Sequence, residues 1–142
     1  MALDLPALEE SFDLIAPEGD RLMDVFYTRL FAAAPAVKPL FARTDLRRQK
    51  AMLLRTLVLL RQSLRDLDAI LPALRALGAR HVGYGAQPEH YAVVGQVLIA
   101  SMAEVAGDAW RDDHERAWGA AFAVVAGVML DGAAAEALDL AA

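Results

Sequence analysis

Hydrophobic residues recur every three to four positions along most of this sequence, which is the spacing of amphipathic α-helices. Ala and Leu dominate, and the alternating β-branched runs that are typical of strands are missing. Proline and glycine separate the helical windows, because both residues interrupt regular helices. The windows that we expect run over Leu8–Ile15, Asp20–Ala33, from Thr44 or Asp45 to about Leu64, Leu74–Val82, Pro88–Gly107 and from Asp112 onward.

These windows predict a single all-α domain over residues 1–142, with six to seven helices and short connections. Pro35 and Pro39 force a break after the second window, and the short fourth helix ends at a pair of glycines. Both features argue against a simple up-and-down bundle. Asp112 is followed three residues later by Glu115, which predicts a capping box at the start of the last helix.

Composition narrows the classes of protein that fit. Of the 142 residues 57% are hydrophobic, above the usual share of about 45–50%, so a disordered chain is excluded. The sequence has no cysteine, which excludes disulfides, zinc ribbons, iron–sulfur clusters and a cysteine nucleophile, and fits a cytoplasmic location. A net charge of −5 predicts no long-range attraction to nucleic acid.

The apolar composition raises the question of a membrane protein. The longest uncharged stretches, Ala117–Leu130 and Tyr91–Ala103, are shorter than the roughly 18–20 residues that span a bilayer. The N-terminus carries Asp4, Glu9 and Glu10 without a basic region, so no signal peptide is visible. We therefore expect no membrane insertion. The apolar surplus then suggests an interior that surrounds something other than protein.

One histidine departs from the pattern in which polar residues lie on the exposed faces of the helices. His81 follows Leu77 by four residues and Leu74 by seven, so it projects from the apolar face of its helix. An imidazole in that position can coordinate a metal, or it can be a core histidine bonded to a backbone carbonyl. The position alone favours the core histidine.

Two more polar residues lie on apolar faces. Gln49 sits in the stripe between Leu46 and Leu53, where a buried amide without partners costs about 1–3 kcal/mol. Either a polar group meets it, or it lies at the exposed first turn of its helix. Tyr27 lies among apolar residues of the second window, and its hydroxyl needs a partner. The alternative is an ordinary core tyrosine whose hydroxyl reaches the surface.

These residues limit the kind of cofactor. His81, His90 and His114 are nine and 24 residues apart, without the short spacing of multi-histidine metal sites. One histidine is too little for zinc, which usually takes three or four protein ligands. It is enough for heme, because the porphyrin supplies four nitrogens and the protein one axial base. A heme would also account for the apolar surplus, with Tyr27 and Gln49 on its opposite face beside a small diatomic ligand.

Several runs of the sequence resemble the bacterial single-domain globins, of the type found in Vitreoscilla, and the heme domain of flavohemoglobins. The resemblance covers nearly the whole chain in order. Its runs are Phe26–Phe31, Pro35 with Pro39–Phe41, Gln49–Leu53, Arg80–Gly85, His90–Tyr91, Val94–Gly95 and Trp118–Gly119.

The resemblance implies a globin fold around a heme pocket and a role for each matching residue. His81 would be the proximal iron ligand, and Phe41 would stack on the porphyrin. Tyr27 and Gln49 would be the distal pair that donates hydrogen bonds to the ligand. The remaining residues would approach the ligand or the heme: Leu53 as the apolar wall, and Arg80, Tyr84 and Val94 at the porphyrin.

The resemblance also implies a function. The protein would hold heme b and reversibly bind dioxygen, nitric oxide and carbon monoxide at a five-coordinate iron, as in oxygen transport. It would dioxygenate nitric oxide, a detoxification, with electrons from an external reductase, since no flavin domain follows Ala142 in this sequence. The alternatives are a gas sensor that signals through a partner protein and a globin-shaped interaction module without heme.

The sequence departs from its relatives at two positions. Ala133 stands where the family carries a glutamate that reaches the proximal histidine and a tyrosine, which is retained here as Tyr91. A carboxylate on the imidazole makes it a stronger electron donor, so its loss argues against peroxidase-like chemistry. We expect His81 to donate to a backbone carbonyl instead. Met52 replaces a basic residue, which would loosen the contact with the heme propionates or the entry gate.

Overall fold

The computed structural model describes residues 3–141, and side chains as far as residue 136. Six α-helices and four short 3₁₀ segments make up this part of the chain, which contains no strand. The all-α prediction with six to seven helices is therefore confirmed. The elements are α1 (Leu5–Ile15), η1 (Ala16–Glu18), α2 (Gly19–Ala33), η2 (Pro35–Phe41), α3 (Leu46–Gln62), η3 (Leu67–Ile70), α4 (Leu71–Gly83), α5 (Pro88–Ala106), η4 (Gly107–Ala109) and α6 (Asp112–Ala141).

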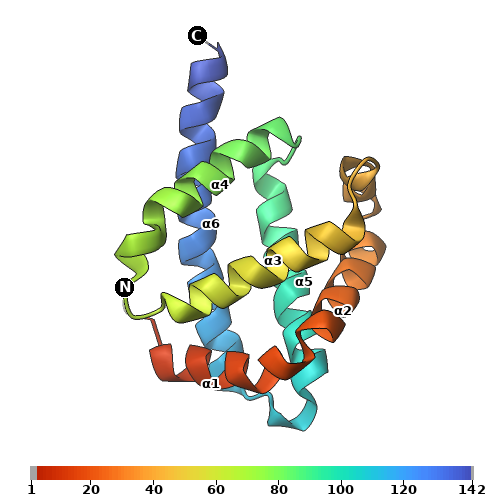
Figure 1. Ribbon diagram of the computed structural model, residues 1–142, viewed down its shortest axis with the longest axis vertical. Helices are drawn as coiled ribbons and strands as arrows, with labels where there is room; N and C mark the ends of the chain where they lie inside the picture. The colour runs from red at the N-terminus through yellow and green to blue at the C-terminus, as the bar shows by residue number, and fades with distance from the viewer. Residues whose placement is uncertain (1–2, 142) are drawn as a thin grey trace.

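The helices cross one another instead of running side by side. In Figure 1, α1, α3 and α4 run across the view, whereas α5 and α6 follow the long axis of the molecule. The closest packing joins α4 to α6 and α2 to α5, and α3 packs against α2 and α1. No comparable packing joins α3 to α4. This arrangement leaves the facing sides of α3 and α4 without a helix between them.

Local side-chain chemistry sets most of the helix starts. Asp45, one of the two expected starts of this helix, is the N-cap of α3 and accepts a hydrogen bond from the Arg48 N–H. The predicted capping box of Asp112 and Glu115 is wrong, because Asp112 is already the first helical residue. Arg111 precedes the helix, and its backbone N–H donates to Nδ1 of His114 at 3.1 Å. An imidazole thus replaces the expected carboxylate at this helix start.

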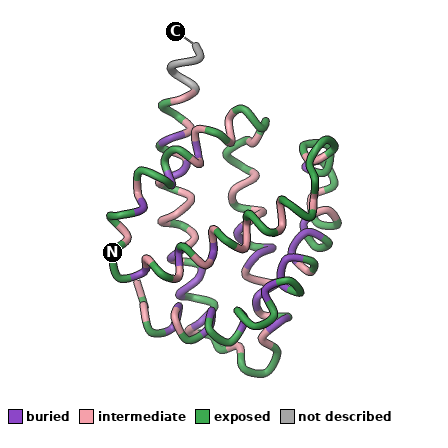
Figure 2. Tube along the Cα trace, viewed as in Figure 1, coloured by how far each residue is buried: buried purple, intermediate pink, exposed green. Residues whose placement is uncertain are grey.

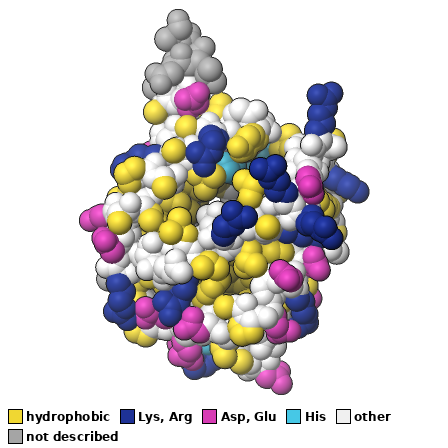
Figure 3. Space-filling view, viewed as in Figure 1, with side chains coloured by type: hydrophobic (Ala, Val, Ile, Leu, Met, Phe, Trp, Pro, Cys, Tyr) yellow, Lys and Arg dark blue, Asp and Glu magenta, His cyan; other side chains and the backbone are white. Residues whose placement is uncertain are grey.

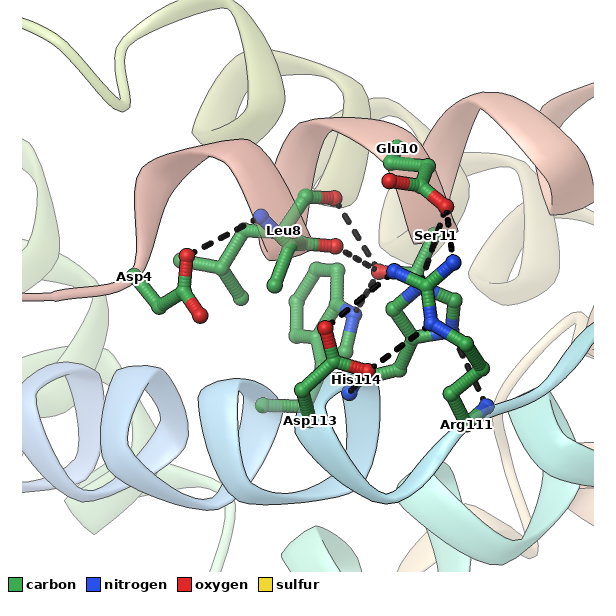
Figure 4. A network of polar contacts seen from close by, with 9 residues as sticks. Asp4, Leu8, Glu10, Ser11, Arg111, Asp113 and His114 are labelled. Carbon is green, nitrogen blue, oxygen red and sulfur yellow. Dashed lines mark hydrogen bonds and ion pairs between the residues drawn. The ribbon is translucent and has the colours of Figure 1, made fainter.

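A polar network fixes α1 against the start of α6 (Figure 4). The indole Nε1–H of Trp118 donates to the hydroxyl of Ser11 at 2.8 Å, and that hydroxyl donates to the carbonyl of Ala7 at 2.7 Å. Ser11 and Trp118 are buried, so neither group has water as a substitute partner. Arg111 adds an exposed ion pair with Glu10.

Replacing Ser11 with alanine should reduce the free energy of unfolding by about 1–3 kcal/mol, because the buried indole N–H of Trp118 loses its acceptor. Ser101→Ala is the matched control. Ser101 is equally buried and also donates to a carbonyl four residues earlier, but no other side chain depends on it. Urea unfolding measures both variants. Equal losses in the two variants would show that the bond to Trp118 adds no stability.

The fully buried residues gather in one half of the molecule. Figure 2 shows them where α1 and α2 meet the second half of α5 and the first half of α6. In α3 only Leu57 and Leu60 are buried, and in α4 only Leu74 and Gly78. Several other apolar residues of α3 and α4 pack against the core but stay partly exposed.

Two glycines let α4 approach α6 more closely than side chains would permit. A Cβ atom on Gly78 would lie 1.9 Å from the carbonyl oxygen of Met129, and one on Gly132 would lie 2.1 Å from that of Arg75. Both partners are backbone atoms and cannot turn away. The close approach fixes the position of α4, the helix that carries His81.

Two helices are long and apolar enough to cross a membrane by length and composition: Pro88–Ala109, with a mean hydropathy of 1.3, and Asp112–Glu136, with 1.6. The core helices of folded domains pass the same test. Here α5 packs against α2 and α6, and α6 packs against α4 and α1. The absence of membrane insertion stays a prediction.

Candidate functional site

His81 lies in the last turns of α4 with its ring held by the helix itself. Its Nδ1 is 2.7 Å from the carbonyl oxygen of Leu77, four residues earlier. A carbonyl can only accept, so Nδ1 carries the proton and donates, which leaves the lone pair on Nε2. The expected bond from His81 to a backbone carbonyl is confirmed. The ring is thereby fixed in the tautomer that a metal ligand requires.

Two tyrosines lie beside the His81 ring. The Tyr84 ring meets it edge-on, with 5.4 Å between the ring centroids, and the Tyr91 ring is tilted at 6.3 Å. Tyr84 and Arg80 are exposed at the end of α4. Both side chains are therefore accessible from solvent, and Tyr84 is also in contact with His81.

Tyr91 has a buried hydroxyl that finds no hydrogen-bond partner among the described residues. Burial raises the pKa of this hydroxyl, so it stays protonated. In the family that the sequence resembles, a glutamate at the position of Ala133 reaches this tyrosine. Here Ala133 offers no polar atom in its side chain. A hydroxyl without a partner is what the loss of that carboxylate would leave. His81 donates to the Leu77 carbonyl instead.

The predicted distal pair comes together across α2 and α3. Tyr27 is buried on α2, and Gln49 is half-buried in the first turns of α3. Burial raises the pKa of the Tyr27 hydroxyl, and a side-chain hydrogen bond with Gln49 lowers it in part. The net pKa lies above that of a free tyrosine, so the hydroxyl keeps its proton at neutral pH and can donate a hydrogen bond to a ligand.

Phe41 and Tyr27 belong to one aromatic cluster. The Phe41 ring, at the end of η2, meets the Tyr27 ring edge-on at 5.9 Å and the Phe31 ring at 5.5 Å. The Tyr27 ring also packs edge-on against Phe26 at 4.9 Å. Such contacts fix the ring orientations. They anchor the turn after α2 and set the direction of the Tyr27 hydroxyl.

A hollow opens between α3 and α4, with hydrophobic side chains on its walls (Figure 3). The predicted residues Leu53 on α3 and Val94 on α5 are half-buried, as are Leu77 on α4 and Val93 on α5. All four are apolar side chains that pack against the core and are still partly exposed. A surface of this kind suits a flat apolar group that contacts both α3 and α4.

The other two histidines have structural roles. Nδ1 of His90 accepts the backbone N–H of Gln87 at 3.0 Å at the start of α5, as His114 does for Arg111 at the start of α6. Among the described side chains, no three His, Asp or Glu residues come together as a metal site. His81 is thus the histidine that remains for cofactor chemistry.

Comparison with known proteins decides the family. The sequence model of the family described as Globin matches residues 24–129. The chain belongs to the globin family. The matched segment contains every residue that we predicted for the site, from Tyr27 to Val94.

The curated relatives of this globin include flavohemoproteins. One from Halalkalibacterium halodurans is 32% identical over 119 residues, which cover 82% of this chain and 29% of the relative. Another, from Vibrio cholerae, is 30% identical over 126 residues, which cover 87% of this chain and 32% of the relative. The chain thus spans about a third of the length of these relatives.

Solved structures show the same fold. An engineered carbene transferase from Rhodothermus marinus superimposes with a TM-score of 0.82 at 22% identity, covering 96% of this globin and 97% of the other chain. A bacterial globin from Campylobacter jejuni superimposes with a TM-score of 0.79 at 21% identity, covering 91% of this chain and 93% of the other. The predicted globin fold is confirmed.

The globin family implies heme, and the residues present fit it. His81 offers a free Nε2 lone pair, because Nδ1 is committed to the Leu77 carbonyl. The half-buried apolar residues beside the hollow offer the lining that a porphyrin face needs. Tyr27 and Gln49 offer protonated donors on the α2–α3 side. Axial base, apolar walls and polar donors are the three components of a heme pocket for small ligands.

Sequence reasoning missed some contacts that shape the site. The contact of Phe31 with Phe41 has no local signal, because it depends on how η2 folds back on α2. The close approach of α4 to α6 at Gly78 and Gly132 also cannot be read from the spacing of hydrophobic residues along either helix. The unpartnered hydroxyl of Tyr91 could have been found, since the departure at Ala133 removes its expected partner.

Proposed function

We propose that this globin holds heme b, reversibly binds dioxygen and other diatomic gases at a five-coordinate iron, and dioxygenates nitric oxide with electrons from a separate reductase. The observation that carries the proposal is the fixed tautomer of His81. Its Nδ1 donates to Leu77 and leaves Nε2 as the axial base. Heme would supply the iron, and this chain would supply a histidine ligand and the surroundings of the bound gas.

His81 would act as a neutral ligand of ordinary donor strength. A backbone carbonyl is a weaker hydrogen-bond acceptor than a carboxylate, so the imidazole ring gains less basicity from it. Ala133 supplies no carboxylate. The chain is therefore better suited to holding a gas than to cleaving an oxygen–oxygen bond.

Tyr27 and Gln49 would donate hydrogen bonds to the bound gas. Dioxygen develops partial negative charge on its outer atom, and hydrogen bonds to charged groups contribute about 1.5–3 kcal/mol. Carbon monoxide develops less charge and gains less. Leu53 and Val94 would exclude water from the pocket, which strengthens these hydrogen bonds. The pocket should therefore favour dioxygen retention and slow its release.

The remaining parts of the proposal rest on composition and on the relatives. The absence of cysteine is compatible with heme b, because c-type attachment needs thiols, and with a cytoplasmic location. Phe41, Arg80 and Tyr84 would contact the porphyrin. The relatives named flavohemoprotein support a link to a flavin reductase. The reaction would combine one nitric oxide, one dioxygen and one electron into one nitrate.

The proposed reaction is tested by nitric oxide consumption. The oxygenated protein should consume one nitric oxide per heme and yield one nitrate, and a generic flavin reductase with its reduced nicotinamide should sustain repeated turnover. A nitric oxide electrode and nitrate analysis measure both. A gas sensor would bind nitric oxide without making nitrate. Bound nitric oxide with no nitrate would therefore contradict the dioxygenase proposal and favour the sensor.

A further inference from the structure

Charge is distributed unevenly along this globin. The segment 35–80, from η2 to the end of α4, contains ten of the 14 basic residues and three of the 19 acidic residues. Its net charge is +7, and the rest of the chain carries −12. The segment forms the α3 and α4 walls of the hollow. A chain of net charge −5 thus concentrates its positive charge in the segment that forms these two walls.

Three of the ten basic residues hold the fold together. Arg61 pairs with Asp13 at 2.9 Å, Arg65 with Glu9 at 2.7 Å and Lys50 with Asp24 at 2.9 Å. These ion pairs fasten α3, and the turn that follows it, to α1 and α2. They explain part of the positive charge as structural.

Six other arginines have no such role. They are exposed and take part in no ion pair among the described side chains. We call them the basic rim: Arg43, Arg47, Arg48, Arg55, Arg75 and Arg80. Figure 3 shows Lys and Arg side chains along the upper and right-hand edges of the hollow. Their charge is available to a partner, because no carboxylate among the described side chains pairs with it.

The first turn of α3 shows that the rim does not serve the stability of its own helix. Arg47 and Arg48 lie in that turn, which contains no acidic residue. Cations at a helix N-terminus are opposed by the helix dipole. Charges that work against local stability are expected where another molecule uses them.

The shape of the charged surface favours a compact protein. An apolar centre within a polar, charged rim is the usual layout of a protein–protein interface. An extended polyanion such as DNA would run beyond the rim onto the parts of the chain that carry −12, which would repel it. The complementary partner is therefore an acidic face of limited size.

We propose that the basic rim is the docking surface for an acidic electron-donor flavoprotein. The inference rests on the proposed function, in which electrons come from a separate protein. Docking here would place the donor at the open side of the heme pocket. One electron would pass from the reduced flavin to the ferric iron, so that the flavin is oxidised by one electron and the iron is reduced by one, with no bond made or broken.

Flavodoxin, an acidic flavoprotein, is a suitable probe. Reduced flavodoxin is mixed with the ferric, heme-loaded globin, and the rate constant of heme reduction is measured by stopped flow. The rate constant should fall at least tenfold between about 20 and about 300 mM salt, because ionic screening removes attraction between complementary faces. The double variant Arg47→Gln/Arg48→Gln should be about three- to tenfold slower at low salt.

A matched control separates the rim from net charge. Arg21→Gln/Arg116→Gln removes the same two charges from exposed positions outside segment 35–80, and it should retain the low-salt rate constant within about twofold. Binding of oxidised flavodoxin, followed by fluorescence anisotropy, should show the same order among the proteins. This readout does not depend on the heme reaction.

Three outcomes would overturn the proposal. One is a rate constant that does not change with salt. Another is an equal loss of rate and of binding in the rim variant and its control. The third is tighter binding to a short DNA duplex or to vesicles of anionic lipid than to flavodoxin. Heme loading is checked by the visible spectrum of each sample, so a failure to bind heme would contradict the proposed function and not the rim.

Discussion

Replacing His81 with glycine should weaken heme binding more than about 100-fold, and free imidazole should restore it. Loss of a residue that merely orients a metal ligand typically costs 10–100-fold in affinity, so loss of the ligand itself should cost more. The glycine leaves space where an imidazole from solution can reach the iron. The carbonyl of Leu77, which accepts from Nδ1 of His81, remains available to orient the added imidazole.

Heme titration followed by the Soret absorbance measures the His81→Gly effect, with and without millimolar imidazole. His90→Gly is the matched control. It also removes an imidazole and adds a helical glycine, but it changes only the cap at Gln87, so heme affinity should stay within about threefold. Circular dichroism checks that both variants fold. Full heme affinity in folded His81→Gly without imidazole would show that another residue ligates the iron.

Replacing Tyr27 with phenylalanine should speed dioxygen dissociation about 10- to 100-fold. The ring, its burial and its contacts with Phe26 and Phe41 are retained, and only the hydroxyl is lost. A hydrogen bond to a charged acceptor contributes about 1.5–3 kcal/mol, and about 1.4 kcal/mol corresponds to a tenfold change. Gln49 remains as a donor, which limits the loss.

The dissociation rate constants are measured by stopped-flow displacement in the wild type and in Tyr27→Phe. Carbon monoxide serves as the internal control, because it develops little charge, and its dissociation should change less than about threefold. An unchanged dioxygen rate constant would remove Tyr27 from the ligand site. Equal acceleration for both gases would indicate that the variant has opened the pocket and that no specific hydrogen bond was lost.

The sequence predicts the elements of this fold well because their ends are local. Proline and glycine mark where helices stop, and Asp45 caps α3 through a residue three positions away. The capping error at the start of α6 has a local cause too. The helix begins at Asp112, and buried His114, three residues after Arg111, accepts the backbone N–H of Arg111.

Contacts between distant segments escape the pattern. Trp118 and Ser11 are 107 residues apart, and nothing in either helix alone says that they meet. Gly78 and Gly132 are equally uninformative in the sequence, because a glycine in a helix permits a close approach but does not show which segment approaches it. These contacts depend on how whole helices cross, which single-helix periodicity does not contain.

The candidate site also combines features that are local in the sequence with features that depend on contacts between helices. Periodicity places His81 on the apolar face of α4, and helix geometry brings a ring at that position to the carbonyl four residues earlier. The pairing of Tyr27 with Gln49 crosses from α2 to α3 and was predicted from the family resemblance, not from spacing. The basic rim needed the structure as well, because it joins charges of α3 and α4 across the hollow.

The most direct test of the heme-pocket account is the visible spectrum of the purified protein, reduced and loaded with heme. We predict a Soret band of a five-coordinate ferrous heme, which shifts when dioxygen or carbon monoxide is added, because in the proposal His81 would be the one protein ligand of the iron. The absence of a Soret band after addition of heme would contradict the account.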